Sequence, residues 1–594
     1  TLPAIRASKR AMSCGATSSQ RSRAACIVGA TSAASAYRVP SRDTTINAPS
    51  RVPLSRVASF MEDLRRVRSQ GAVEGNRVVT IAARPCVGFA DGSREPVGGP
   101  MRRPILIPLA ALTLSACART GATGDRTVTL LHANDTYRIL GMPEAGVGGV
   151  ARLRTLRTRM EAEHPVLVTH AGDLISPSLL SRETDGAHMI NALNHLDGDG
   201  PARDDRLVVT LGNHEFDADD CDDGPILERL FDASRFPWLD TNLDWGPKPG
   251  SDCRYVLASS TLVDRHLVDL DGVTVGVVGV TTDKKHPAYV RGFADPLDTL
   301  RAEIPALRES GADVVVALTH LTVAEDRALL QALGDARPDV LLGGHDHVAI
   351  TDQVDGTWLL KAHADLATVQ VVDVQVARDG TVSVAPRLVP LDASIPEDPA
   401  MATLAADHVR AFDRSWCGAR DLPDDCLDTP VGRTASGLVM EEYAIRTRET
   451  NAGDWFADLT LDAHRDLGAD IALINSGGLR INRDLPPGAD VTRRHLEELF
   501  PFGTDLRLVR LSGRTLQQVL DHSVEGWTGS GHWLQVAGLR FVHDPDTETA
   551  RNVDLVDANG RARPLSPTDD LIAVVPRYLV DPAIGDQDGY AMLL

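Results

Sequence analysis

Five apolar runs of strand length recur between residues 126 and 347, and each of them stops at strongly polar side chains. They are rich in valine and leucine and mostly continuous rather than alternating, which is typical of strands covered on both faces. The runs read TVTLLHAND (127–135), PVLVTHAGD (165–173), RLVVTLGNH (206–214), ADVVVALTH (312–320) and DVLLGGHDH (339–347). Helical or loop stretches separate them, so the pattern predicts a layered α/β domain.

The residues that end these runs share an affinity for metal ions. In layered α/β proteins the C-terminal ends of strands converge on one rim, where ligands bind. Imidazole, carboxylate and amide oxygen suit zinc, manganese, iron or cobalt, and so many ligands indicate two ions that share a carboxylate. Alone, Asp173 could cap a helix and His320 could be a core histidine, but the joint pattern favours a site. The candidate ligands are Asp135, Asp173, Asn213, His320, His345 and His347.

The charge of the chain is unevenly distributed. The formal net charge is −21, but residues 1–116 hold 17 Lys and Arg against 6 Asp and Glu, so the remainder carries −32. An acidic body repels phosphate backbones, and we therefore expect no nucleic-acid polymer as a partner. An anionic substrate would need metal ions or well-placed arginines. The length of 594 residues predicts two folded domains with additional segments.

The segment MRRPILIPLAALTLSACART, which begins at Met101, has the features of an export signal. Two arginines precede an apolar stretch, and small residues precede Cys117, as in bacterial lipoprotein signals. The pattern predicts a signal peptide over 101–116, lipidation of Cys117 and a lipid-anchored protein on the periplasmic or extracellular face of the cell envelope. Because such a signal works at the start of a chain, residues 1–100 are interpreted as non-native upstream sequence, with a disordered or targeting extension as the alternative.

Four cysteines remain beyond Cys117, and none of them has the spacing of a zinc knuckle or a redox motif. An even number of cysteines in an exported protein predicts two disulfides. The pairing of cysteines closest in sequence joins Cys221 to Cys253 and Cys417 to Cys426, although the sequence leaves other pairings open.

The motifs GD (172–173), GNHEFD (212–217), TH (319–320) and GHDH (344–347) resemble those of the calcineurin-like metallophosphoesterases, and GNHEFD resembles the 5′-nucleotidase branch. The resemblance implies β-sandwich sheets flanked by helices over 126–395. It also implies that Asp173 bridges two divalent ions, zinc, manganese or similar. Asp135 and His347 would then bind one ion, while Asn213, His320 and His345 bind the other.

The same resemblance assigns the catalytic pair. His214 would be the catalytic histidine, placed over the phosphate, and Asp217 would hold its imidazole and favour the charged form. The first motif departs from the family, since it reads NDTY and places Tyr137 where a histidine ligand is usual. Tyr137 is a candidate ligand that would suit a harder ion such as iron or manganese. The alternative is that Tyr137 only lines the pocket and that water completes the coordination.

The sequence pattern changes after residue 395. Residues 396–440 are predicted to be a connector with some helix, and 441–594 resembles the C-terminal domain of 5′-nucleotidases. The matching stretches include YAIRTRETNAGDWFADL, INSGGLRIN, LFPFGTDLRLVRLSGRTLQQVLDHSVE and DGY. Within them, the helix over 513–524 is expected to supply core residues. The resemblance therefore predicts a second α/β domain that binds the nucleotide.

The same resemblance assigns substrate contacts to residues of this second domain. The resemblance assigns phosphate binding to two arginines, base contacts to the NSGG motif, a sandwich around the base to two aromatic rings, and the ribose hydroxyls to an aspartate. These residues are Arg446 and Arg480, Asn475 and Gly477, Phe502 and Tyr578, and Asp588. About four more residues separate Tyr578 from Asp588 than in the family pattern.

The function that follows is an exported phosphohydrolase that removes the 5′-phosphate of nucleotides through a dimetal-activated hydroxide. Hydrolysis of nucleoside diphosphate sugars such as UDP-sugars, or of 2′,3′-cyclic nucleotides, uses the same architecture and is the alternative. A non-catalytic nucleotide-binding lipoprotein with a decayed metal site is less consistent with the sequence, because the other ligands are retained.

Overall fold

The computed structural model describes residues 26–29, 125–198, 200–217, 221, 225–502, 505–527, 529–582 and 587–594. The predicted signal peptide at 101–116, Cys117 and the predicted upstream segment other than 26–29 lie outside these residues. Within the described ranges, we find no helix with the length and apolar character needed to cross a membrane.

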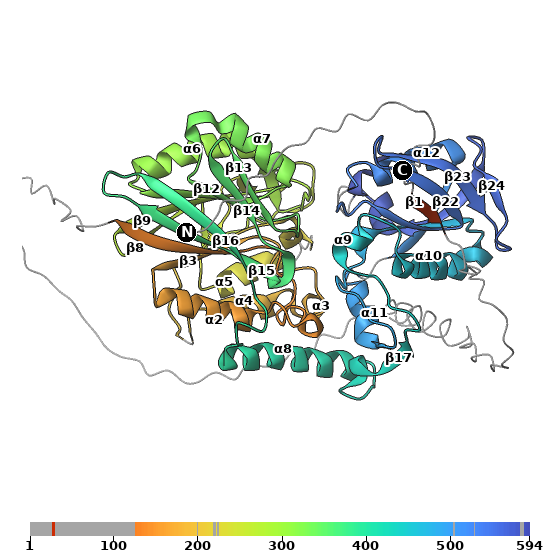
Figure 1. The fold of residues 1–594 in the computed structure, drawn as a ribbon, viewed down its shortest axis with the longest axis horizontal. Helices are drawn as coiled ribbons and strands as arrows, with labels where there is room; N and C mark the ends of the chain where they lie inside the picture. The colour runs from red at the N-terminus through yellow and green to blue at the C-terminus, as the bar shows by residue number, and fades with distance from the viewer. Residues whose placement is uncertain are drawn as a thin grey trace, which may run out of the picture. The chain divides into compact units, whose positions relative to one another are not determined.

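Two mixed sheets packed face to face form the N-terminal domain (Figure 1). The first sheet has the order β16 (Val382–Pro390), β15 (Thr368–Val376), β2 (Arg126–Ala133), β3 (Val166–Ala171), β4 (Leu207–Thr210), β5 (Trp238–Leu239) and β7 (Leu262–Val263). The second has the order β13 (Ile350–Val354), β14 (Thr357–Lys361), β12 (Val340–Gly343), β11 (Val314–His320), β9 (Val273–Thr281) and β8 (Arg265–Leu270). The five apolar runs form β2, β3, β4, β11 and β12, so the predicted strands are confirmed.

Helices cover the outer face of each sheet and explain why the strands are apolar on both sides. Leu130, Val208, Val316 and Leu342 belong to the core between the sheets. The outer face of the first sheet packs against α2 (Val150–Glu161), α4 (Ala187–Leu193), α5 (Ile226–Ala233) and α8 (Pro399–Gly418). The outer face of the second packs against α6 (Pro296–Glu309) and α7 (Val323–Leu333). The result is an α/β domain of four layers.

The direction of the strands brings the polar residues that follow them to one region. β2, β3 and β4 run parallel to one another in the first sheet. β9, β11 and β12 run parallel in the second sheet. The carboxyl ends of parallel strands share an edge of their sheet, and this is where α/β proteins place their ligands. The candidate ligands stand at the ends of β2, β3 and β4 in the first sheet and of β11 and β12 in the second, so both sheets contribute to the site.

The segment after the N-terminal sheets begins with a long helix, and the described residues contain two disulfides. α8 leads to a short strand, β17 (Pro430–Arg433), which pairs with β19 (Asp490–Thr492). One disulfide joins Cys221 to Cys253 and the other joins Cys417 to Cys426. The pairing of cysteines nearest in sequence is thus confirmed.

The C-terminal domain contains a mixed sheet between two helical faces. Its order is β20 (Leu506–Ser512), β25 (Asp570–Pro576), β18 (Ile471–Asn475) and β21 (Leu534–Ala537). Along β18, Ile471 and Leu473 belong to the core with α12 (Gly513–Val524), whereas Ala472 and Ile474 pack with α10 (Asn451–His464). The expected core role of α12 is confirmed by its buried Leu516, Val519, Leu520 and Val524.

A further sheet in this domain has the order β1 (Cys26–Gly29), β22 (Leu539–Asp544), β23 (Thr549–Val556) and β24 (Ala562–Pro564). β1 comes from the segment interpreted as upstream sequence, and it pairs antiparallel with β22. Three short α-helices remain among the described residues, α3 (Ser181–Thr184), α9 (Glu442–Ile445) and α11 (Arg493–Leu499), and α9 contributes Glu442 to the site described next.

Candidate metal centre

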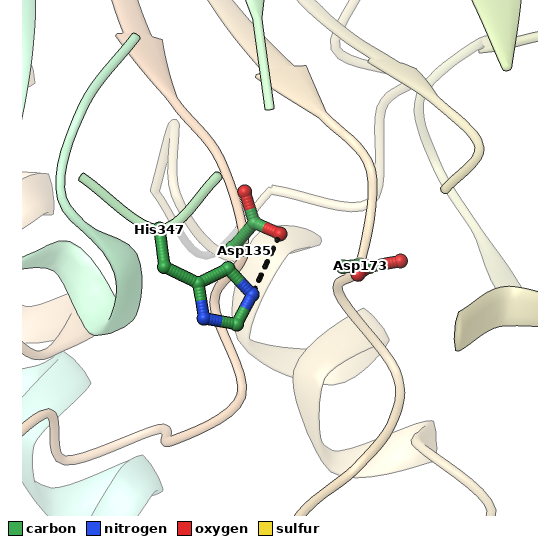
Figure 2. A group of neighbouring side chains, drawn as sticks. All are labelled: Asp135, Asp173 and His347. Atoms are coloured by element: carbon green, nitrogen blue, oxygen red, sulfur yellow. Dashed lines mark ion pairs between the residues drawn. The ribbon is translucent and has the colours of Figure 1, made fainter. Parts of the chain in front are cut away.

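Asp135, Asp173 and His347 form a buried group of potential metal ligands, with ligand atoms that all lie within 4.8 Å of one another (Figure 2). Asp135 follows β2, Asp173 follows β3 and His347 follows β12. The Nε2 atom of His347 lies 3.3 Å from Asp135 Oδ1. Three side chains from two sheets thus converge on one point.

His320 and His345 also lie close to the two carboxylates of this group. His320 Nδ1 lies 2.6 Å from the carbonyl oxygen of Ala171, so Nδ1 donates and Nε2 faces Asp173 Oδ2 at 3.3 Å. The rings of His320 and His345 lie 5.1 Å apart, and the backbone N–H of His345 donates to Asp135 Oδ2. The structure therefore brings five of the six candidate ligands together, and it places Asn213 next in sequence to His214, whose backbone N–H donates to Asp173.

The donors in this group fit a divalent cation. Among the residues that the structure describes, Asn213 Oδ1 is buried without a hydrogen-bond partner, and the buried His320 Nε2 has only the carboxylate of Asp173 beside it, at 3.3 Å. Buried polar atoms are rarely left unsatisfied, and both atoms are good ligands for zinc or manganese. Two buried carboxylates in the same group also require positive charge nearby.

The titration behaviour of the histidines gives the same indication. Burial opposes protonation of His320, but the charge and hydrogen bond of Asp173 raise its pKa to about 9. Burial likewise opposes protonation of His347, but Glu442 and Asp135 raise its pKa to about 9. Without a bound cation, the protonated rings of His320 and His347 compensate the negative charge of the carboxylates. A bound cation would replace the protons that these rings carry.

The turns that present the ligands have an unusual backbone. Asp135, Asp173, His345 and His347 have φ angles of 50°, 56°, 81° and 61°. Such left-handed conformations cost free energy in residues other than glycine, and they cluster at functional sites. The turns are also tightly packed, since a Cβ at Gly212 would collide with Asp173 Oδ1 and the ring of His320.

Glu215 holds two of these turns together, although the sequence analysis assigns it no role. Its carboxylate accepts hydrogen bonds from the backbone N–H groups of Gly212, Asp173, Leu174 and Ile175. Burial raises the pKa of Glu215, since the side chain is only 3% exposed. The turn after β3 and the turn after β4 are therefore joined by one carboxylate.

Tyr137 points into the group of potential ligands. Its hydroxyl oxygen lies 2.8 Å from His347 Nε2, 3.1 Å from Asp173 Oδ2 and 3.3 Å from Asp135 Oδ1. Burial and the charges of Asp173 and Asp135 raise the pKa of Tyr137 well above its usual value. Without a bound cation, the Tyr137 hydroxyl is therefore neutral and can donate a hydrogen bond to the carboxylate of Asp173 or Asp135.

The predicted catalytic pair lies beside the ligands. His214 Nδ1 lies 2.9 Å from Asp217 Oδ2, and the backbone N–H of His214 donates to Asp173 Oδ1. Burial opposes ionisation of Asp217, but the charges of His214 and Lys285 lower its pKa below the usual range. Because Asp217 accepts from Nδ1, the Nε2 atom of His214 is directed away from it, toward Arg480 Nη2 at 3.4 Å.

Each of the two predicted phosphate-binding arginines has an unused donor. Arg446 Nη2 forms an ion pair with Glu442 Oε1 at 2.6 Å, while Arg446 Nε and Arg480 Nη1 are buried without a hydrogen-bond acceptor within the described ranges. Arg480 Nε donates to the carbonyl of Gly477, which fixes the arginine against the NSGG motif. Both guanidinium groups can therefore accept an oxyanion as a new partner.

The predicted nucleoside-binding residues fall into two groups. Asn475 Nδ2 donates to Asp588 Oδ2 at 2.9 Å, and the hydroxyl of Tyr578 lies 3.3 Å from Asp588 Oδ1. Phe502 lies instead against His214, with ring centroids 5.8 Å apart, and it is 40% exposed. The aromatic ring of Phe502 thus stands next to the predicted catalytic histidine.

Several residues of the site carry no signal in the sequence. Glu442 contacts His347 and Arg446, and Arg138 Nη2 donates to the carbonyls of Arg480 and Ile481. Lys284 Nζ lies 2.8 Å from His345 Nε2, and Lys285 Nζ lies 3.3 Å from Asp217 Oδ1. The positions of these two lysines beside His345 and Asp217 can be recognised only from the three-dimensional structure.

Comparison with known proteins covers both domains. Residues 128–349 match the family model of calcineurin-like phosphoesterases, and residues 430–593 match that of the 5′-nucleotidase C-terminal domain. The human 5′-nucleotidase is 26% identical over 468 residues, which cover 71% of this chain and 76% of the relative. A trifunctional nucleotide phosphoesterase of Bacillus subtilis is 25% identical over 453 residues, which cover 70% of this chain and 29% of that protein.

The solved structures include a 5′-nucleotidase precursor from Thermus thermophilus, with a TM-score of 0.64. It is 24% identical, and the superposition covers 79% of this chain and 92% of the other. This likeness shows that the two chains share their fold.

Proposed function

Because the chain belongs to the 5′-nucleotidase family, with a calcineurin-like phosphoesterase domain and a 5′-nucleotidase C-terminal domain, it is a phosphoric ester hydrolase, and we propose that it removes the 5′-phosphate of nucleotides. The observation that carries this proposal is the pair of buried arginines with unused donors beside the group of potential metal ligands. An oxyanion placed there would satisfy both arginines and lie next to His214.

In this proposal, two divalent ions are held by Asp135, Asp173, Asn213, His320, His345 and His347. When bound, such a pair supplies Lewis acidity and a nucleophile at neutral pH. Arg446 and Arg480 orient the phosphate by planar, bidentate contacts. His214 directs Nε2 toward the position of the developing charge, while Asp217 holds Nδ1 and so keeps the ring in that orientation.

We also propose that Tyr137 is a ligand, because its hydroxyl oxygen is already within hydrogen-bond distance of three members of the ligand group. Tyr137→Phe removes only that oxygen, and we expect it to weaken the binding of one of the two ions by about tenfold or more. Tyr137→His should instead raise the affinity for zinc, since imidazole suits that ion. Metal content and affinity are measured on the purified proteins by competition with a chromophoric chelator. Unchanged affinity in Tyr137→Phe would mean that the ring only lines the pocket.

The base is proposed to stack on Phe502 and Tyr578. Phe502→Ala should raise the KM for AMP about fivefold, which corresponds to the lower end of the roughly 1–3 kcal/mol that stacking contributes per base. The KM for ribose 5-phosphate, which has no base, should not change. Leu508→Ala is the control variant, because Leu508 is a comparably exposed apolar side chain of the same domain. An equal change of KM for both substrates would place the base elsewhere.

Export and lipid anchoring through Cys117 form part of the proposal. They are supported by the signal-like segment at 101–116 and by the two disulfides, since disulfides persist in oxidising compartments. The substrate would then be a nucleotide outside the cytoplasm.

The function is tested by phosphate release from AMP, UDP-glucose and 2′,3′-cyclic AMP, each with and without added Mn²⁺ or Zn²⁺. We expect metal-dependent release from AMP at the highest kcat/KM and loss of activity on chelation. Preference for UDP-glucose or for the cyclic nucleotide would replace the proposed substrate, and no hydrolysis of any of them would overturn the assignment to nucleotides.

A further inference from the structure

Glu442 connects the two halves of the site through one carboxylate. It is the first residue of α9, and its Oε1 atom lies 2.6 Å from His347 Nδ1 and 2.6 Å from Arg446 Nη2. His347 is a proposed metal ligand from the N-terminal domain, and Arg446 is a proposed phosphate-binding residue from the C-terminal domain. All three side chains are at most 15% exposed.

The contact with His347 determines which nitrogen faces the ligand group. A carboxylate only accepts, so His347 donates from Nδ1 to Glu442, and Nε2 is the nitrogen that faces Asp135 and Tyr137 and would become a ligand once a cation displaces its proton. A carboxylate on the far nitrogen of a metal-binding imidazole fixes the tautomer and the ring orientation and increases the basicity of the ligand.

The contact with Arg446 orients the other partner. The guanidinium group is anchored at Nη2 by its ion pair with Glu442, while Nε has no hydrogen-bond acceptor among the described residues. The arginine is therefore held in place by an ion pair and still has a donor for an oxyanion.

We propose that Glu442 is a positioning residue that orients His347 for metal binding and Arg446 for phosphate binding at the same time. The inference rests on the proposed metal centre and substrate site. According to this proposal, the metal affinity at His347 depends on Glu442, which lies 95 positions later in the sequence, in the domain proposed to bind the nucleotide.

The test compares Glu442→Ala, Glu442→Gln and a matched control, Glu441→Gln. Glu441 precedes Glu442 and caps α9, because its carboxylate accepts from the N–H groups of Tyr443 and Ala444 rather than from His347 or Arg446. Zinc affinity of the metal-free full-length proteins is measured by chelator competition without substrate, and the KM and kcat for AMP are measured separately.

We expect Glu442→Ala to lower the affinity for one zinc ion by about 10–100-fold, the usual effect of losing such a partner. Glu442→Gln keeps an acceptor for His347 and should lose less affinity, while both variants raise KM more than they lower kcat. Wild-type zinc affinity in a folded Glu442→Ala protein, or an equal loss in Glu441→Gln, would overturn the proposal. If the wild type binds zinc but hydrolyses no nucleotide, the proposed substrate fails while the zinc titrations still decide the role of Glu442.

Discussion

Replacing Asp173 with alanine is expected to abolish phosphate release almost completely. Its two oxygens face different partners, since Oδ1 accepts from the backbone N–H of His214 while Oδ2 lies near His320 and Tyr137. A carboxylate in this position would hold both of the proposed ions, and it also supports the turn that carries His214. We expect kcat/KM to fall by at least about 10³-fold, because the metal pair contributes several kcal/mol to the transition state.

The measurement includes metal content as well as turnover. Asp173→Ala should retain fewer than two ions per chain, whereas a change of turnover with full metal content would contradict the bridging role. Asp204→Asn is the control, because Asp204 is also a buried carboxylate, but its side chain pairs with Arg157 and accepts from the N–H of Arg206 rather than from any candidate ligand. It should lower stability while leaving the metal content of the folded protein unchanged.

The strands of the site could be predicted because their physical cause lies within short segments. A strand between another sheet and a helix layer is buried on both faces, and so β3 and β11 are continuous apolar runs that end in polar residues. The candidate ligands follow from the same pattern, because a polar residue at the end of a buried strand is easily recognised. The extra strand β1 has only four residues, too few to give a periodic signal.

The residues that the sequence did not reveal act through contacts distant along the chain. Glu442 and Arg138 reach partners 95 and more than 340 positions away, and each also has an ordinary explanation as a charged surface residue. Glu215 stands inside the GNHEFD motif, but its role is to accept backbone N–H groups from a turn about 40 positions earlier. Such roles depend on which loops meet, and a local pattern does not contain that information.

His214→Ala is expected to leave metal binding near normal while lowering kcat by roughly 10²–10⁴-fold, the usual contribution of a positioned acid or base. His214 stands next to Asp173 through a backbone contact rather than through its ring, so removal of the imidazole should spare the ligand group. Asp217→Asn should have a smaller effect, because the ring remains but loses the carboxylate that orients Nδ1.

The KM for AMP should change less than kcat in both variants, since the proposed phosphate contacts of Arg446 and Arg480 are retained. Metal analysis and steady-state kinetics on the same preparations separate the two roles. Loss of metal in His214→Ala would make this residue a part of the metal centre, and full activity would remove it from the chemistry. The double variant of His214→Ala and Asp217→Asn then decides whether the pair acts as a unit. An orienting carboxylate has no function once the imidazole is gone, so the double variant should be no slower than His214→Ala alone.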